Sequence, residues 1–370
     1  MTDMLTRTPG TTSPEWVEEF AGVLTCTAVT DITHDVRSFS FALPGGAGLL
    51  FHPGQYLTLQ LDLDGGTVER CYTISSSPAL SAGPTITVKR VPGGPVSNWL
   101  HDHLRPGDVL RASGPLGVFS TAHHPSRRYL LLSAGSGITP LMSMVRDLRD
   151  RADGADVVFV HCARTPADII FRTELAELAA SGVAAVHILC EEDSPTETWE
   201  GPRGRLTLPA LFGAAPDLLE REVFSCGPPP FMAAVREHLT LVAADPARCH
   251  EESFVLGTAG APPAPGATPS GPGDPSLGSG TAPTTYTVEF LRSGRVLECD
   301  EHTTVLSAAA AAGMSLPSSC TEGLCGTCKS TLVSGEVDMQ HQGGIRAREV
   351  ALGKFLPCCS RPRSDLQVDA

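Results

Sequence analysis

The sequence contains little positive charge and no long apolar run. Its 370 residues include 27 Lys and Arg against 41 Asp and Glu, which gives a formal net charge of -14. Nucleic acids and anionic membranes bind basic surfaces, so we expect neither as a partner. No stretch of about 18 apolar residues is present, and residues 1–15 lack the apolar core of a secretory signal. We therefore expect a cytoplasmic protein without a membrane segment.

Aromatic residues are also few, at 5% of the chain, but 41% of the residues are hydrophobic, which is ordinary for a folded protein. The length allows two or three domains, each with its own core. The chain has 12 cysteines. In a reducing compartment, a tight group of cysteines indicates metal binding or catalysis rather than disulfides.

Residues 257–285 contain 14 Gly or Pro and no aromatic residue. A segment of this composition cannot offset the entropy of ordering, so we predict a flexible linker there. Residues 1–17 are likewise predicted to be disordered.

Three patterns divide the rest of the chain. From about residue 20 to 120, short alternating segments such as QYLTLQLDL and TITVKRV lie between Gly and Pro turns, which predicts an antiparallel β-barrel. From about residue 128, apolar strands alternate with helical stretches, which predicts an α/β domain with a parallel sheet. After the linker we expect a hairpin around Ser293-Gly294 and a helix that is capped by Thr303 or Thr304 and ends at Gly313.

Three cysteines lie close together in the segment SCTEGLCGTCKS. Cys320, Cys325 and Cys328 have the spacing C-x4-C-x2-C, and Cys358 follows after 29 further residues. This is the spacing of four thiolates around a plant-type 2Fe-2S cluster. Zinc also binds four thiolates and is the alternative metal.

Residues 285–370 resemble a plant-type ferredoxin domain, which implies an α+β fold of the β-grasp type. Gly323 and Gly326 would let the cysteine loop fold tightly around the cluster. The segment CCSRPRSD is similar to the family pattern in which the fourth ligand stands four residues before a Pro. This match implies Cys358 as the ligand and leaves Cys359 as the alternative.

Four motifs follow one another in the barrel-like region: FHPGQYL, RCYTISS, VPGGPVSNWL and SGPLGVF. Together they resemble the FAD-binding barrel of the ferredoxin–NADP reductase superfamily. The resemblance implies that Arg70 binds the flavin pyrophosphate with its planar, charged fork and that Tyr72 lies against the flavin. It implies a catalytic role for Thr73, whose hydroxyl would hydrogen-bond near flavin N5. The other FAD contacts that it implies are Tyr56, Gly93, Gly94, Val96 and Ser97.

The segment LLLSAGSGITPLMSM places a Gly-rich turn between a strand and a helix, where a helix N-terminus can face a dinucleotide pyrophosphate. The candidate residues of this turn are Gly135, Gly137, Thr139 and Pro140. In the resembled superfamily a Cys-Gly-Pro turn lies beside the nicotinamide, which implies Cys226 and Gly227 here, with Cys226 close to the path of the hydride as a second catalytic residue. The resemblance also implies that Phe254 can shield the flavin face.

The choice between NADH and NADPH depends on basic residues after the second strand of this domain. Arg164 and Arg172 lie there, and a 2′-phosphate would need a guanidinium. Arg172 is alternatively a solvated helix residue near Glu174. We favour NADH because similar oxygenase reductases commonly use it, which is an analogy.

These features together predict an NAD(P)H-dependent oxidoreductase that passes electrons through FAD and a 2Fe-2S cluster to a separate protein. The segment DMQHQGGIR resembles reductases of Rieske-type oxygenases, including demethylases of quaternary ammonium compounds, so we predict a terminal oxygenase as acceptor. Alternatives are a hybrid-cluster or di-iron acceptor, or a redox-sensing module without hydride chemistry. We expect a monomer. The predicted domains are 18–125 (FAD), 126–256 (NAD(P)) and 286–370 (2Fe-2S).

Overall fold

The structure is a computed structural model that forms two compact units. It describes residues 16–63, 66–79, 83–253, 284–314, 316, 323, 326, 328–341 and 343–370. One unit contains the barrel and the parallel sheet, and the other contains the C-terminal domain. None of the described helices has the length and apolarity that crossing a membrane requires.

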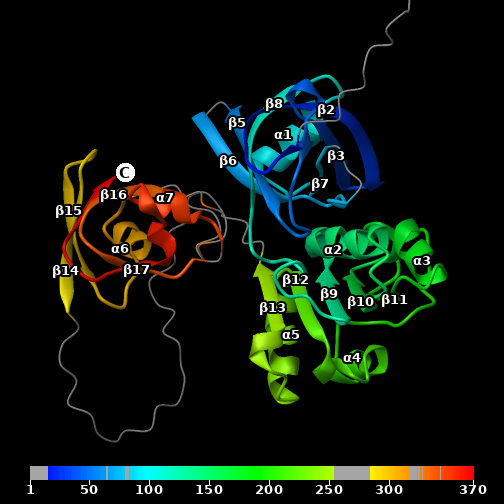
Figure 1. The fold of residues 1–370 in the computed structure, drawn as a ribbon. Coiled ribbons are helices and arrows are strands. Elements are labelled where there is room, and N and C mark those ends of the chain that lie inside the picture. The colour runs from blue at the N-terminus through cyan, green and yellow to red at the C-terminus, as the bar shows by residue number, and fades with distance from the viewer. Residues whose placement is uncertain are drawn as a thin grey trace, which may run out of the picture. The chain divides into compact units, whose positions relative to one another are not determined.

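A six-stranded antiparallel sheet forms the N-terminal barrel, with the strand order β6-β5-β8-β2-β3-β7 (Figure 1). The two outer strands meet through a bridge between Ile74 and Ile86, and the Ser75 N–H donates to the Thr85 carbonyl at 2.7 Å, which closes the sheet. The predicted antiparallel barrel is thus confirmed. Its strands are β2 (Phe20–Thr33), β3 (Val36–Ala42), β5 (Tyr56–Leu63), β6 (Gly66–Thr73), β7 (Thr85–Lys89) and β8 (Val109–Leu116), and it carries η1 (Pro44–Gly46) and α1 (Pro95–His103).

Alternation of apolar and polar residues places one face of each strand in the barrel core. Phe39, Leu57, Leu59 and Ile86 are fully buried there. Helix α1 adds Leu100 to the same core, so its N-terminal turn is held in a fixed place on the barrel.

The N-terminal segment differs from the prediction. Trp16 and Val17, which we expected at the end of a disordered segment 1–17, form β1 (Trp16–Val17) and pair in parallel with β4 (Gly48–Leu49). The Trp16 ring covers Gly48, where an added Cβ would lie 2.6 Å from the ring. This contact of the ring with Gly48 accompanies the pairing of the two strands, and Trp16 itself stays 45% exposed. Residues 1–15 lie outside the described residues.

The second domain has the strand order β11-β10-β9-β12-β13, and β9 to β12 run parallel to one another. The predicted parallel α/β sheet is confirmed. Its strands are β9 (Arg128–Ala134), β10 (Asp156–Ala163), β11 (Ala185–Cys190), β12 (Glu222–Gly227) and β13 (Cys249–Ser253). Its helices are η2 (Gly135–Gly137), α2 (Ile138–Asp150), η3 (Pro166–Asp168), α3 (Arg172–Ala180), α4 (Leu208–Ala214), η4 (Leu218–Glu220), α5 (Pro229–Leu241) and η5 (Pro246–Arg248).

Helices cover both faces of this sheet. Leu130 and Leu132 of β9 share a core with residues of α4 and α5, and α2 contacts β9 and β12 from the other side (Figure 1). The chain leaves β9 toward β10 and β11 in one direction and returns to β12 on the other side. The strand order therefore reverses between β9 and β12, and ligands of open α/β sheets bind at the carboxyl ends of the strands at such a point.

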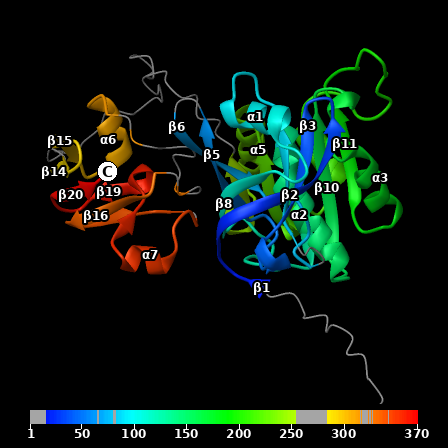
Figure 2. The same ribbon diagram turned by 90° about the horizontal axis from the view of Figure 1, so that it is seen from above.

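The C-terminal domain has a five-stranded mixed sheet of order β15-β14-β20-β16-β18 and a two-stranded sheet, β17-β19. The first hairpin lies beside a parallel last strand, which is the predicted β-grasp arrangement. In Figure 2, α6 lies above β16, β19 and β20, and α7 lies below them. The elements are β14 (Thr285–Phe290), β15 (Arg295–Asp300), α6 (Val305–Ala311), β16 (Ser330–Ser334), β17 (Val337–Met339), α7 (Ala347–Ala351), β18 (Lys354–Phe355), η6 (Pro357–Cys359), β19 (Ser360–Pro362) and β20 (Leu366–Asp369).

Two local predictions for this domain are confirmed. Phe290 pairs with Arg295, so the hairpin turns where Ser293-Gly294 predicted it. Thr304 caps α6 by accepting a hydrogen bond from the Ser307 N–H at 3.3 Å. The predicted linker 257–285 lies outside the described residues except for its last two positions.

Candidate functional site

The flavin motif RCYTISS lies on β6 and its continuation. Tyr56 of β5 pairs with Thr73, and Leu57 pairs with Tyr72. Arg70 and Tyr72 stand two residues apart and so share one face of the strand, whereas Thr73 is buried on the other. Burial raises the pKa of the Tyr72 hydroxyl, and the nearby Arg70 offsets only part of this. Tyr72 therefore keeps its proton and offers a neutral aromatic ring for packing against a flat ligand.

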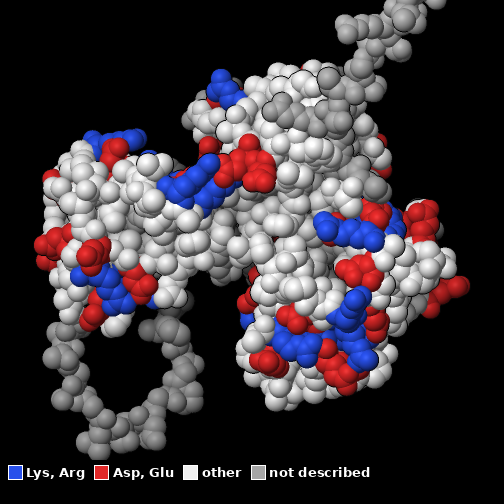
Figure 3. All heavy atoms as spheres, in the orientation of Figure 1, with Lys and Arg blue, Asp and Glu red and all other residues white. Residues whose placement is uncertain are grey.

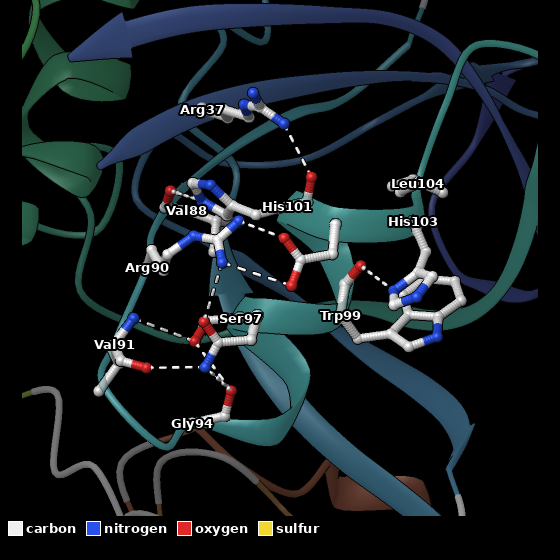
Figure 4. Close-up of polar contacts among 12 residues, drawn as sticks. Arg37, Val88, Arg90, Val91, Gly94, Ser97, Trp99, His101, His103 and Leu104 are labelled. Atoms are coloured by element: carbon white, nitrogen blue, oxygen red, sulfur yellow. Dashed lines mark hydrogen bonds and ion pairs between the residues drawn. The ribbon is translucent and has the colours of Figure 1, made fainter. Parts of the chain in front are cut away.

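The motif VPGGPVSNWL forms a turn that leads into α1 (Figure 4). Ser97 Oγ accepts from the Val91 N–H at 3.2 Å, and Asn98 Nδ2 donates to the carbonyls of Val91 at 3.0 Å and of Gly94 at 2.8 Å. Gly93 has a φ of +71°, which an L side chain rarely adopts. The side chains of the helix thus fix the shape of the turn before any ligand binds.

Backbone amides at the start of α1 are the groups that can receive a phosphate. Gly94 N–H already donates to the Val91 carbonyl at 2.9 Å, and Pro95 has no N–H. The first-turn amides of Val96 and Ser97 remain, because such groups have no partner within a helix. The turn can therefore donate the N–H groups of Val96 and Ser97 to an anionic phosphate, whereas the Gly94 N–H is already occupied.

Arg90 is a basic residue of this turn that the sequence analysis did not select. Its guanidinium donates to Asp102 at 2.5 and 3.3 Å and to Asn98 Oδ1 at 3.3 Å (Figure 4). These contacts hold its positive charge against α1. The sequence places an Arg directly before VPGG, but nothing there distinguishes it from a solvated strand end.

The two nicotinamide motifs meet at the reversal of strand order. A Cβ added to Gly137 would lie 2.2 Å from the Cys226 carbonyl oxygen and 2.6 Å from the Gly227 nitrogen. A Cβ on Gly227 would in turn lie 2.6 Å from the Phe231 ring. Only glycine fits at these two positions. The structure thus brings together two motifs that lie about ninety residues apart in the chain.

Thr139 and Pro140 are buried in the first turn of α2. Thr139 Oγ1 donates to the Ser136 carbonyl at 3.1 Å, and Gly135 has a φ of +53°. These contacts shape the turn that precedes the helix N-terminus, where a pyrophosphate can bind.

Cys226 is fully buried, and burial raises the pKa of its thiol well above the usual value, with a smaller contribution from the charge of Glu252. At neutral pH it is therefore a neutral thiol and not a nucleophilic thiolate. A neutral contact beside the path of a hydride is the chemistry that this residue can supply.

Glu252 of β13 is a second buried group that the sequence analysis missed. It is 4% exposed, and its Oε2 has no hydrogen-bond partner among the described residues. Burial raises the pKa of Glu252 to about 8. In the segment HEESF nothing sets Glu252 apart from the exposed Glu251. Phe254, which we did select, lies outside the described residues.

The two candidate arginines for a 2′-phosphate differ in their surroundings. Arg172 donates to both oxygens of Glu197 at 2.7 and 2.8 Å and lies over the Trp199 ring. Arg164 is 69% exposed, and its Nε lies 3.9 Å from Asp168. Arg172 is thus occupied by an ion pair, and its partner is Glu197 rather than Glu174.

The described part of the cysteine loop fits an iron–sulfur cluster. Cys328 and Cys358 are buried in one apolar cluster with Ile345 and Leu356, although 29 residues separate them in the chain. Gly323 and Gly326 have φ values of +73° and +70°. Buried thiols in an apolar setting with tight turns suit soft metal ligation. Cys320 and Cys325 lie outside the described residues.

Cys359 occupies a different place from Cys358. It is half-buried at the edge of the same apolar cluster, and an added Cβ on Gly323 would lie 2.6 Å from its Sγ. Both adjacent cysteines therefore remain near the loop, and the choice of the fourth ligand stays a prediction.

Two other clusters of potential metal ligands occur among the described residues: His124, Glu222 and His250, and His34, Asp35 and Asp168. In the first, His250 Nε2 lies 2.7 Å from Glu222, and the two imidazole rings stack at 3.6 Å. The two ring planes are inclined by only 24°, so the nitrogen lone pairs of the two imidazoles lie in nearly parallel planes. A hydrogen-bonded pair with a stacked neighbour explains this cluster without a metal.

Comparison with known families gives three matches in order along the chain. Oxidoreductase FAD-binding domains match residues 24–121, oxidoreductase NAD-binding domains match residues 131–237, and 2Fe-2S iron-sulfur cluster binding domains match residues 288–363. The cofactors expected from the sequence, FAD, a nicotinamide nucleotide and a 2Fe-2S cluster, are therefore those of this chain.

Relatives align with this chain over nearly their whole length. The glycine betaine monooxygenase reductase subunit of Pseudomonas aeruginosa (strain UCBPP-PA14) is 43% identical over 350 residues, which cover 93% of this chain and 94% of that protein. The stachydrine N-demethylase reductase subunit of Rhizobium meliloti (strain 1021) is 42% identical over 351 residues, 94% of this chain and 96% of that one. The solved structure of phthalate dioxygenase reductase matches with a TM-score of 0.56 and 25% identity, over 95% of this chain and 98% of that chain.

We expect Gly137→Ala to weaken nicotinamide binding by at least about 10-fold, or 1.4 kcal/mol, because the new methyl group would overlap the Cys226 carbonyl. FAD content should stay unchanged. The measurement is the dissociation constant of NADH and the flavin-to-protein ratio of the purified protein. Gly213→Ala is the control, since an added Cβ there meets no atom within 4 Å. Unchanged NADH affinity in Gly137→Ala would contradict this placement of the nucleotide.

We expect Glu252→Gln to become more stable relative to the native protein as the pH rises from 5 to 8. The folded protein holds the Glu252 proton up to a pKa of about 8, whereas the unfolded chain releases it near 4.5. Native stability therefore falls through this window, by up to about 1.4 kcal/mol per pH unit, and the amide variant avoids the loss. Urea midpoints followed by flavin release at pH 5, 7 and 8.5 measure the difference. Glu251→Gln, at an exposed ion pair with Arg236, should show no such trend.

Proposed function

The chain belongs to the family of these three-domain reductase subunits, and from that premise we propose that it carries electrons from NADH to a separate oxygenase component. One observation supports this most directly. The nicotinamide turn at Gly137 meets Cys226 at the reversal of strand order, in the same compact unit as the flavin strand β6. In this proposal the buried cysteines of the C-terminal domain hold the 2Fe-2S cluster that passes the electrons to the oxygenase.

When bound, FAD accepts two electrons as a hydride and releases them one at a time to the 2Fe-2S cluster. In our proposal Arg70 and the amides of Val96 and Ser97 bind the flavin phosphates, and Tyr72 packs on the flavin ring. Thr73 is only 5% exposed, and in this proposal its hydroxyl donates a hydrogen bond near flavin N5.

On the other side of the reaction, the turn at Gly135 and Gly137 and the N-terminus of α2 bind the nicotinamide pyrophosphate. Cys226 and Glu252 line the hydride path as neutral groups, because burial raises the pKa values of both. Their lack of charge keeps water and competing ions from being stabilised there.

We propose NADH as the donor because the arginines that could bind a 2′-phosphate in the NAD-binding domain already form ion pairs with acidic side chains. Arg172 pairs with Glu197, Arg203 with Asp193 at 2.6 Å, and Arg205 with Glu191 at 3.2 Å. A 2′-phosphate would have to compete with a carboxylate for each of these guanidinium groups. Arg164 is the remaining candidate for such a contact.

We propose that the acceptor is an oxygenase that acts on a quaternary ammonium compound. The two whole-length relatives above are named for glycine betaine and stachydrine, at 43% and 42% identity. On the side shown in Figure 3, Lys and Arg of the described part of the 2Fe-2S domain lie beside Asp and Glu, and Arg292–Asp369 and Arg363–Asp338 are ion pairs. Docking therefore depends on local contacts more than on long-range attraction.

We further propose that the protein works as a cytoplasmic monomer. One chain carries all three cofactor domains, so no partner subunit is needed to complete the path from donor to cluster. Light scattering of the purified protein tests the oligomeric state.

The function is tested by an anaerobic titration with NADH and then NADPH, followed by candidate oxygenase components. We expect NADH to bleach the flavin and then the cluster at lower concentration than NADPH. We expect NADH consumption to depend on a quaternary ammonium substrate once the matching oxygenase is added. Reduction of a dye but of no such oxygenase would favour a hybrid-cluster or di-iron acceptor. Absence of dye reduction with either nucleotide would leave only a redox-sensing module.

The ligands that we propose for the cluster are Cys320, Cys325, Cys328 and Cys358. We expect Cys358→Ser to lose the visible cluster absorption and the acid-labile sulfide, because a buried thiolate ligand is removed. Cys359→Ser is the matched control at the adjacent position and should retain both. NADH should still reduce the flavin in both variants. The reverse pattern, with the cluster lost only in Cys359→Ser, would assign Cys359 as the ligand.

A further inference from the structure

We propose that Arg146 is a positioning residue for hydride transfer, which holds the flavin strand of the barrel against the helix that begins at the nicotinamide turn. The inference rests on the proposed function, since it concerns the distance between the two bound cofactors. Arg146 belongs to neither the flavin motifs nor the nicotinamide motifs.

Arg146 uses its whole guanidinium group. Nη1 donates to the carbonyl of Ser75, just after β6, while Nε donates to Glu174 Oε1 at 2.8 Å and Nη2 to the other oxygen of the same carboxylate. Its Cζ lies 4.6 Å from the centroid of the Phe171 ring. The side chain is only 15% exposed. A planar fork with three hydrogen bonds and a stacked ring has little freedom to move.

Ser75 is fixed from the barrel side as well. It is fully buried, its N–H donates to the Thr85 carbonyl at 2.7 Å, and its hydroxyl lies 2.8 Å from Thr87 Oγ1. Arg146 therefore binds a segment that is hydrogen-bonded to β7 and cannot move independently of the barrel. Thr73, the residue proposed to meet flavin N5, lies two residues before Ser75.

A second contact one turn earlier on α2 points to the same segment. Ser143 Oγ donates to the Ser76 carbonyl at 2.8 Å. Residues three apart lie on one face of a helix, so Ser143 and Arg146 together bind two consecutive carbonyls. Helix α2 begins at Ile138, directly after Gly137. The rigid helix thus links the nicotinamide turn to the strand that carries Thr73.

The surroundings of Arg146 show that its role is mechanical rather than electrostatic. Glu174 lies opposite its charge, so little field is left to act on a flavin. Phe171 has a φ of +58°, a conformation that a bulky residue rarely adopts, and this places its ring over the guanidinium. The strained residue, the ion pair and the barrel carbonyl all meet at this one side chain.

Hydride transfer depends steeply on such a link. The reacting atoms must lie about 3 to 3.5 Å apart, and a displacement of about 1 Å can lower the rate about 100-fold. Removal of Arg146 would free the Ser75 carbonyl and one side of α2 while leaving both nucleotide-binding motifs intact.

The test is anaerobic stopped-flow reduction of the FAD in the full-length holoprotein by NADH. We expect Arg146→Ala to lower the limiting rate of flavin reduction by about 10- to 100-fold. The long-wavelength charge-transfer absorbance between nicotinamide and flavin should weaken, while FAD content and the concentration of NADH at half-maximal rate stay within about 3-fold. Arg146→Lys should recover part of the rate, because an ammonium can reach Ser75 but cannot bind Glu174 as a fork.

Arg149→Ala is the matched control. Arg149 lies one turn further along α2 and approaches Glu174 at 3.5 Å, but its two ion-pair partners, Asp150 and Glu174, both lie outside the barrel. The limiting rate of flavin reduction and the charge-transfer absorbance of Arg149→Ala should equal those of the native protein. Ser143→Ala is a milder second variant that should shift both signals in the direction of Arg146→Ala.

Native limiting rates and an unchanged absorbance band in Arg146→Ala would overturn the proposal, as would a loss of rate in strict proportion to lost FAD. If Arg146→Ala does not fold, native rates in both Arg146→Lys and Ser143→Ala would overturn it. If the native protein itself fails to reduce its flavin with NADH or NADPH, the proposed function fails and this inference fails with it. Reduction by the native protein with no change in the variants refutes this inference alone.

Discussion

The close approach of Gly137 to the backbone of Cys226 is the constraint on which the arrangement of the first unit depends. The Cβ of any larger residue would lie 2.2 Å from the Cys226 carbonyl oxygen, so the turn after β9 and the end of β12 behave as one rigid element. Helix α2 leaves from this element. It contacts β9 and β12, and its residues Ser143 and Arg146 donate hydrogen bonds to the Ser76 and Ser75 carbonyls. The position of the flavin strand therefore follows from a contact at the nicotinamide turn.

Groups that could carry charge near this element are kept neutral by burial. Burial raises the pKa of Glu252 to about 8 and that of the Cys226 thiol well above its usual value, while it lowers the pKa of His161 to about 3. His161 pairs in register with Ser133, which pairs with Cys226, so these side chains form a row across the sheet. His161 Nδ1 lies 2.8 Å from Ser133 Oγ.

Local patterns predicted the parts of the fold that local chemistry determines. Alternating residues gave the barrel strands, Ser293-Gly294 the hairpin, and Thr304 the start of α6, because each depends on a few neighbouring residues. The Gly-rich turn and the Cys-Gly-Pro turn were found as separate motifs, and the fold showed that they touch. The sequence did not reveal Glu252, since its burial depends on strand β13 lying beside β12. It did not reveal Arg146 either, because its partners are a carbonyl and a carboxylate from distant segments.

The division of the chain into two compact units matches the different demands of its two kinds of electron transfer. A hydride moves only between atoms that nearly touch, so the barrel and the parallel sheet must share one rigid unit. Single electrons need no such contact geometry, so the cluster can belong to a unit of its own. If residues 257–285 form the flexible linker that their composition predicts, the cluster keeps a high effective concentration near the flavin and can still turn to a partner. The chain would then hold the two domains of hydride transfer in a fixed arrangement and leave the cluster domain free to move between the flavin and the partner protein.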